Sequence, residues 1–160
     1  MRSAWAPTGQ RPVALGHHRF KWLYVIAFVA PATGDTEWYL SNGVSKPFFE
    51  KLLLAFANDV GAGPNKRVIL LLDNAGWHTL PNLAVPDGLR LVYLPPYSPE
   101  LQPAETLWTL VDEPIVNRHI ASIAELETIV AKRCLHLIDQ KQAIQARTAF
   151  HWWPTKTKAS

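Results

Sequence analysis

The chain has 160 residues, of which 48% are hydrophobic and 18% charged, as in one soluble domain that is large enough to bury its own core. This composition excludes a disordered tail, and the longest apolar run, residues 22–30, is far shorter than the roughly 20 residues of a membrane helix. Because the N-terminus has no apolar signal-peptide core, we expect a cytoplasmic protein that does not contact a membrane. The single cysteine, Cys134, cannot form an internal disulfide and is expected to be buried on a helix.

Charge is unevenly distributed along the chain. Residues 1–34 carry four basic and no acidic side chains, and residues 121–160 carry six basic and three acidic ones. Residues 35–120 carry six basic and ten acidic ones. Basic ends suit a polyanion such as DNA, and an acidic centre suits a cation. A solvated surface with random charge placement explains the same distribution equally well.

The first half of the chain predicts a hairpin followed by a helix. Aromatic and β-branched residues over 20–29 predict a buried strand, and residues 36–40 return as a second strand after a turn. Ser45 is placed to cap a helix whose apolar residues recur at four-residue spacing, and Gly61 is placed to end it.

The second half alternates strands and helices. Residues 66–72 contain an apolar run without alternation, which predicts a strand that is covered on both faces and central in its sheet. Residues 89–94 predict a further strand. A helix is expected from Pro103 until Pro114 interrupts it, and Ser122–Glu125 has the form of a capping box. This order of elements predicts an α/β fold that is not divided into two domains.

Two carboxylates stand at positions that suit a metal site. Asp73 ends the most apolar strand, where α/β sheets place ligand-handling residues, and Glu105 follows the next strand. If these strands are neighbours, both carboxylates lie at one sheet edge, and such oxygen ligands suit Mg²⁺ or Mn²⁺. On spacing alone, a purely structural role explains both residues too. Asp73 would then belong to a turn, and Glu105 would be a favourable anion at a helix N-terminus.

The sequence around these acids resembles a known enzyme family. The runs Val68–His78 and Leu94–Trp108 closely resemble the catalytic domain of DDE-type transposases, in the bacterial insertion-sequence branch related to the mariner transposases. The first run matches the family's strand ending in Asp-Asn followed by His. The second matches its Leu-Pro-Pro-Tyr-Ser-Pro-Glu-Leu-Asn-Pro-x-Glu-x-x-Trp block. With a weaker match at Trp5, the resemblance extends over most of residues 5–135.

The resemblance implies a ribonuclease-H-like mixed sheet flanked by helices, on which three acidic residues bind two divalent metals, Mg²⁺ or Mn²⁺. The metals activate water or a DNA 3′ hydroxyl for attack on a phosphodiester. By position, Asp73 would be the second acid and Glu105 the third, each as catalytic residue and metal ligand. Asn74 and His78 match positions near the site and are expected to support it, although turn and capping roles suit them equally well.

The first acid of the family has no counterpart here. In the family it lies on a strand before the Trp-x-Pro-x-Gly segment, whereas only residues 1–4 precede Trp5. The resemblance therefore implies that residues 1–148 are a truncated DDE catalytic domain without its first, central strand, and that residues 149–160 are a basic, Trp-containing tail. The family's helix-turn-helix DNA-binding region is missing as well, so no residue is assigned to DNA binding.

Two functions stay open, and with them the question whether the chain is an enzyme. The first is the carboxyl-terminal part of a transposase for DNA strand cleavage and transfer, inactive alone because the first catalytic Asp is missing. The second is a non-catalytic module that binds DNA without sequence preference through its basic ends. In both cases the partner is DNA, self-association is expected where a missing strand exposes sheet edges, and the location is the bacterial cytoplasm, at the nucleoid when DNA is bound.

Overall fold

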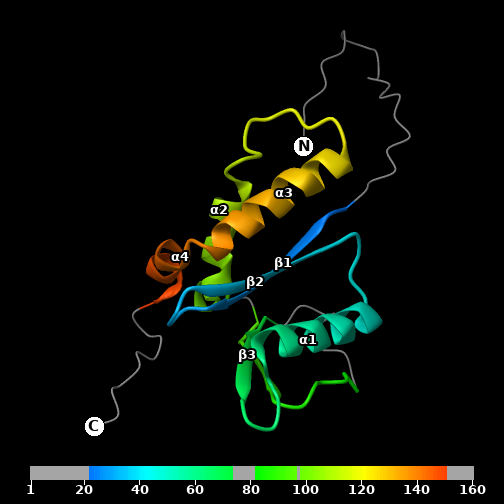
Figure 1. The fold of residues 1–160 in the computed structure, drawn as a ribbon, viewed down its shortest axis with the longest axis vertical. Helices are drawn as coiled ribbons and strands as arrows, with labels where there is room; N and C mark the ends of the chain where they lie inside the picture. The colour runs from blue at the N-terminus through cyan, green and yellow to red at the C-terminus, as the bar shows by residue number, and fades with distance from the viewer. Residues whose placement is uncertain (1–21, 74–81, 97, 151–160) are drawn as a thin grey trace, which may run out of the picture.

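The computed structural model describes residues 22–73, 82–96 and 98–150 and shows an α/β arrangement of small sheets and helices (Figure 1). None of the helices in these ranges is long and apolar enough to cross a membrane. The elements in chain order are β1 (Tyr24–Ala30), β2 (Asp35–Ser41), α1 (Lys46–Val60), β3 (Val68–Leu72), β4 (Leu89–Tyr93), the 3₁₀ turns η1 (Pro99–Leu101) and η2 (Pro103–Leu107), α2 (Trp108–Asp112), α3 (Ile123–Ile138) and α4 (Lys141–Thr148).

Within the described residues the strands form two two-stranded sheets. β1 pairs with β2 antiparallel, and β3 pairs with β4 parallel. Within the part of the chain that the structure describes, β3 is neither central nor covered on both faces, contrary to expectation, because its sheet has two strands there and Ile69 is 65% exposed. Leu70 and Leu72 pack into a core on one side of β3, whereas the face that carries Ile69 stays largely open.

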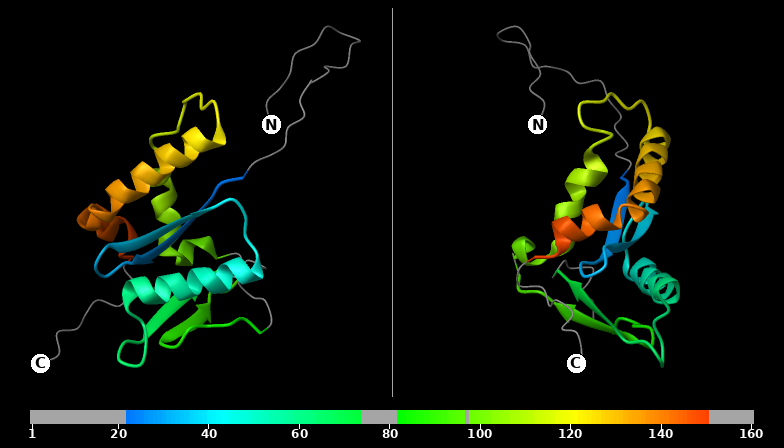
Figure 2. Two further views of the ribbon diagram at one scale, coloured as in Figure 1. Left: turned by 45° about the vertical axis from the view of Figure 1, so that its right-hand side comes forward. Right: turned by 60° about the vertical axis from the view of Figure 1, so that its left-hand side comes forward.

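Helix α1 lies between the β1–β2 hairpin and the β3–β4 sheet (Figure 2). As expected, Ser45 caps it, because the Phe48 backbone N–H donates to Ser45 Oγ at 3.3 Å, and Gly61 ends it with φ +68°. The Phe28 and Phe56 ring centroids are 4.2 Å apart, which joins β1 to α1. The first core consists of Phe28, Phe49, Leu52, Leu53, Phe56, Leu70 and Leu72.

A second core lies on the other face of the hairpin, under α2, α3 and α4 (Figure 2). Alternate residues of β1 face the two cores: Ile26 and Phe28 contact the first, and Val25 and Val29 contact the second. The hairpin is therefore a wall that both cores share. The second core consists of Leu107, Val111, Val130, Cys134, Leu137 and Ile144.

The expected capping box begins α3. The Glu125 backbone N–H donates to Ser122 Oγ at 3.1 Å, and the Glu125 carboxylate accepts a hydrogen bond from the Ala121 N–H at 2.9 Å. Cys134 is buried on the apolar face of this helix, as expected. Its burial raises the pKa of the thiol to about 11.

Helix α4 is absent from the sequence prediction. Ile144 and Thr148, one turn apart, are its only buried residues, so the apolar periodicity is too weak to mark a helix. An ion pair attaches α4 to the hairpin: Lys141 Nζ lies 2.6 Å from Asp35 Oδ1. Asp35 itself begins β2 and is not part of the preceding turn.

Candidate functional site

Asp73 follows the last residue of β3 directly, at the position that the sequence predicts for it. Leu72, which is 5% exposed in the first core, fixes the end of the strand. The Asp73 side chain is half-buried. The first core therefore determines where this carboxylate lies.

Glu105 lies in η2, between two residues that anchor the turn. Pro103 and Leu107 are both buried, and Leu107 is 0% exposed in the second core. The helix expected from Pro103 begins as a 3₁₀ turn, because the Glu105 N–H donates to the Gln102 carbonyl at 3.1 Å, three residues back, and it continues as α2. The Glu105 side chain is exposed to solvent.

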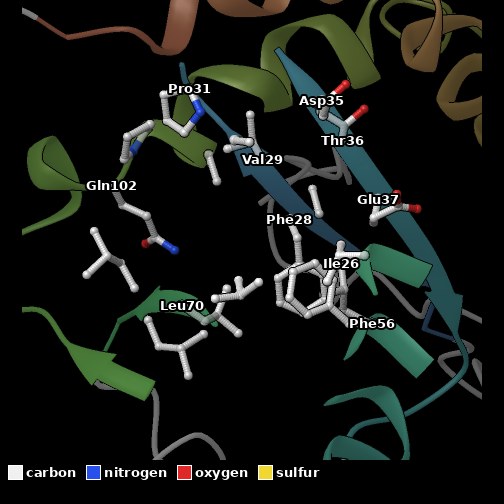
Figure 3. A pocket seen from close by; sticks show the side chains of 18 of the residues that line it. Ile26, Phe28, Val29, Pro31, Asp35, Thr36, Glu37, Phe56, Leu70 and Gln102 are labelled. Atoms are coloured by element: carbon white, nitrogen blue, oxygen red, sulfur yellow. The ribbon is translucent and has the colours of Figure 1, made fainter. Parts of the chain in front are cut away.

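Asp73 and Glu105 line the same groove, which lies between the two sheets and has a volume of about 510 Å³. All residues of β1 and β3 line it, together with residues of α1 and η2. Ile26, Phe28 and Leu70 form part of its apolar wall (Figure 3). The structure thus brings the two predicted acids to one groove from different elements, one attached to each core.

Two further carboxylates, Asp35 and Glu37 of β2, also line the groove (Figure 3). The hydrogen bond from Lys141 holds the pKa of Asp35 below its usual range. Burial raises the pKa of Glu37, and the neighbouring Asp59 carboxylate adds to this shift. Sequence reasoning did not assign them to the site, because no motif surrounds them and only the folding of the hairpin brings them to the groove.

The carboxylate oxygens at the groove suit a cation, but the described residues do not supply a complete set of metal ligands. Carboxylate oxygens such as those of Asp73 and Glu105 are the ligands that Mg²⁺ prefers. No group of three or more His, Cys, Asp or Glu that could hold a metal ion occurs in residues 22–73, 82–96 and 98–150. Asn74 and His78, the predicted supporting residues, and Trp5 lie outside the described residues.

In α/β folds, ligand-handling residues lie beyond the carboxyl ends of the strands, as Asp73 does after β3, and carboxylate oxygens are ligands that a divalent cation accepts. The chain belongs to the DDE superfamily endonuclease family, whose sequence profile matches residues 1–127. It is also similar to the uncharacterized protein y4pE/y4sA of Sinorhizobium fredii, with 30% identity over 132 residues that cover 82% of this chain and 96% of that protein. No solved structure matches significantly. The resemblance to DDE-type transposases is thus confirmed at the level of the family.

Proposed function

We propose that these 160 residues are the carboxyl-terminal part of a transposase catalytic domain, which cleaves and transfers DNA strands in insertion-sequence transposition with the help of divalent metal ions. Membership of the DDE superfamily endonuclease family supports a nuclease with DNA as its substrate. The observation that carries the proposal is that Asp73 and Glu105, each from a long family-like motif, line one groove.

In this proposal the carboxylates of Asp73 and Glu105 hold Mg²⁺ or Mn²⁺, with Asn74 and His78 as supporting residues. Such a cation stabilises the attacking and leaving oxygens of a phosphodiester. The chain's own contribution is to place the two carboxylates, one through β3 and one through η2. Because the described residues hold no group of three such ligands, we expect this chain to bind the metal weakly and not to cleave DNA alone.

The proposal includes a ribonuclease-H-like sheet as the finer description of the fold. Such a sheet combines antiparallel and parallel strands, and this chain contains one antiparallel pair, β1–β2, and one parallel pair, β3–β4. Helices pack on the hairpin from both faces, as α1 and α3 do here. The domain would comprise residues 1–148, with residues 149–160 as its tail.

The first test measures metal binding and plasmid nicking in parallel. We expect weak Mn²⁺ binding by the unsubstituted chain, and its loss in Asp73→Asn and in Glu105→Gln, because each substitution removes one anionic ligand. Glu100→Gln is the matched control, since Glu100 is an exposed acid of η1 that does not line the groove. Supercoiled plasmid with Mg²⁺ or Mn²⁺ should stay intact. Nicking that both substitutions abolish would contradict the inactivity of the chain, and metal binding that neither changes would contradict the site.

Metal-free DNA binding is the alternative function, favoured by the excess of basic residues over 121–160. It predicts binding to duplex DNA that weakens steeply with added salt, needs no divalent metal and survives both Asp73→Asn and Glu105→Gln. Fluorescence anisotropy with a labelled duplex at several salt concentrations measures this. Failure to bind at low salt would exclude the alternative.

A further inference from the structure

Helix α4 connects two parts of the chain that border the groove. It contacts the turn of the β1–β2 hairpin and also η2, which carries Glu105. Pro31, Ala32 and Asp35, at or next to the hairpin turn, line the groove together with Gln102–Glu105 (Figure 3). Of the described residues that line the groove, none belongs to α4. The helix therefore joins two walls of the groove without being part of either.

The hairpin turn is attached to α4 by three contacts. Lys141 Nζ lies 2.6 Å from Asp35 Oδ1, and Gln145 Nε2 donates to the Ala32 carbonyl at 2.8 Å. At Gly34, which has φ +76°, an added Cβ would lie 2.0 Å from the Lys141 carbonyl oxygen. The turn therefore lies directly against the backbone of α4, where only glycine fits.

The last turn of α4 is attached to the segment that follows Glu105. Arg147 Nη1 donates to Thr109 Oγ1 at 3.0 Å, and Thr109 Oγ1 donates to the Thr106 carbonyl at 3.2 Å. Thr106 Oγ1 lies 3.4 Å from the Arg147 carbonyl oxygen, to which it donates. Because Thr106 follows Glu105 directly, these contacts act on the residue next to the carboxylate.

The turn that carries Glu105 depends on such contacts, because η2 is a short 3₁₀ turn. Hydrogen bonds in this geometry are poorer than those of an α-helix. Leu107 of η2 and Ile144 of α4 are both 0% exposed in the second core, so α4 also supports the buried side of the turn. Glu105 itself is exposed. The place of its carboxylate is therefore determined by how the turn around it is held.

We propose that α4 positions Glu105 in the groove, with Lys141 and Arg147 as positioning residues that join the turn of Glu105 to the hairpin. The hairpin belongs to both cores, and Asp73 follows a strand of the first core. A link between η2 and the hairpin thus sets the place of Glu105 relative to Asp73. The inference rests on the proposed function, in which the two carboxylates hold a metal ion, and assigns their spacing to a helix outside the groove.

The test measures how η2 lies relative to the first core in the full chain. Nitroxide spin labels are attached through Glu105→Cys and through Lys51→Cys, an exposed position of α1, in a chain that also carries Cys134→Ala. Pulsed electron paramagnetic resonance gives the distribution of distances between the two labels. Arg147→Met and Lys141→Met should each shift or broaden this distribution, because each variant releases one end of α4.

A conservative variant and a matched control separate positioning from a general loss of structure. Arg147→Lys should restore the original distribution, since a lysine ammonium supplies a donor for Thr109 in place of Nη1. Gln142→Met, at an exposed position of the same helix, should leave the distribution unchanged. Each variant should keep the circular dichroism of the unsubstituted chain, because exposed polar contacts contribute little to stability.

The double variant Lys141→Met/Arg147→Met distinguishes one continuous link from two local contacts. If α4 is one link, the release of either end removes the whole effect, and the double variant changes the distribution no further than each single variant does. Additive changes would overturn the proposal. So would unchanged distributions in both single variants, or an equal change in Gln142→Met.

Mn²⁺ binding by chains that retain Glu105 separates this inference from the proposed function. If both carboxylates hold the metal, Arg147→Met should weaken Mn²⁺ binding by up to about tenfold, and Arg147→Lys should not. If the unsubstituted chain binds no Mn²⁺, the proposed metal site fails, whereas the distance distributions still decide the role of α4. A shifted distribution with unchanged Mn²⁺ binding would overturn the link between α4 and the site.

Discussion

The two cores of this protein share the β1–β2 hairpin but are built in different ways. The first core joins one helix, α1, to strands of both sheets, and its largest members are the aromatic residues Phe28, Phe49 and Phe56. The second core packs η2, α2, α3 and α4 against the other face of the hairpin with aliphatic residues such as Leu107 and Leu137. The β3–β4 sheet belongs to the first core alone.

Polar contacts reinforce the second core at several points. Arg133 Nε donates to the Leu110 carbonyl at 2.8 Å and ties α3 to α2, and Arg147 Nη1 donates to Thr109 Oγ1 at 3.0 Å and ties α4 to α2. The first core has a link of this kind between β2 and α1, where the hydroxyl of Tyr39 donates to Asp59 Oδ2 at 2.5 Å.

This difference determines how the candidate site is assembled. Asp73 follows a strand that is anchored in the first core, and Glu105 lies in a turn that is anchored in the second. The distance between the two carboxylates therefore depends on how the cores are held relative to one another across the groove. Substitutions in one core should displace one carboxylate and leave the other in place.

The largest effects are expected from cavities in the two cores. Leu53→Ala in the first core and Leu107→Ala in the second should each lower the free energy of unfolding by about 2–5 kcal/mol, since both side chains are 0% exposed. Leu135→Ala should stay within about 0.5 kcal/mol, because Leu135 is 66% exposed. Urea unfolding measures the loss, and hydrogen exchange locates it. If both core substitutions speed exchange equally in α1 and in α3, the two cores are a single cooperative unit and the comparison fails.

A smaller effect is expected where α3 is tied to α2. Arg133→Met keeps much of the aliphatic side chain but removes the hydrogen bond to Leu110 and the ion pair with Glu113. We expect a loss of about 1–2 kcal/mol in urea unfolding. Lys132→Met is the matched control, because Lys132 is an exposed neighbour on the same helix. Equal losses in both variants would show that the contact with α2 does not stabilise the second core.

The smallest effect concerns Glu37 in the groove. Its pKa is raised by burial and by the neighbouring carboxylates, so the folded protein binds the Glu37 proton more tightly than the unfolded chain does. The ionised Glu37 carboxylate therefore destabilises the fold at neutral pH. This destabilisation disappears as the pH falls below the ordinary glutamate pKa of 4.5. Glu37→Gln should therefore stabilise the protein by less than about 1 kcal/mol at neutral pH and by less in acid.

Thermal unfolding between about pH 4 and pH 7 measures this difference for Glu37→Gln and for Glu127→Gln, an exposed acid of α3 that serves as control. The Glu37 variant should gain stability relative to the unsubstituted chain as the pH rises, and the control should not. If Glu37→Gln stabilises the protein equally at both ends of this pH range, the ionised Glu37 carboxylate is not the cause of the gain.

Local signals explain what the sequence predicts well. The cap at Ser45, the ending at Gly61 and the capping box at Ser122 depend on residues within one helical turn, and all three are present. The periodicity of α1 and α3 is strong because each buries one continuous stripe. Such features depend little on the rest of the fold.

Features that depend on distant parts of the chain could not be predicted in this way. An unbroken apolar run suits a strand buried on both faces, but whether β3 is covered depends on what pairs and packs with it, and Ile69 is exposed here. Helix α4 is held by Ile144, which belongs to the second core, and its other buried residue is Thr148. The residues of the candidate site show the same contrast. Sequence motifs identified Asp73 and Glu105, whereas only the folded hairpin brings Asp35 and Glu37 to the same groove.

The buried thiol of Cys134 makes the difference between the cores accessible to chemical labelling. A thiol reacts with alkylating reagents as the thiolate, and burial keeps this thiol both covered and protonated. Because it is the single cysteine of the chain and lies in the second core, its rate of alkylation under native conditions reports how often that core opens. A change in this rate on adding DNA or metal would reveal a coupling between the groove and the helices behind it.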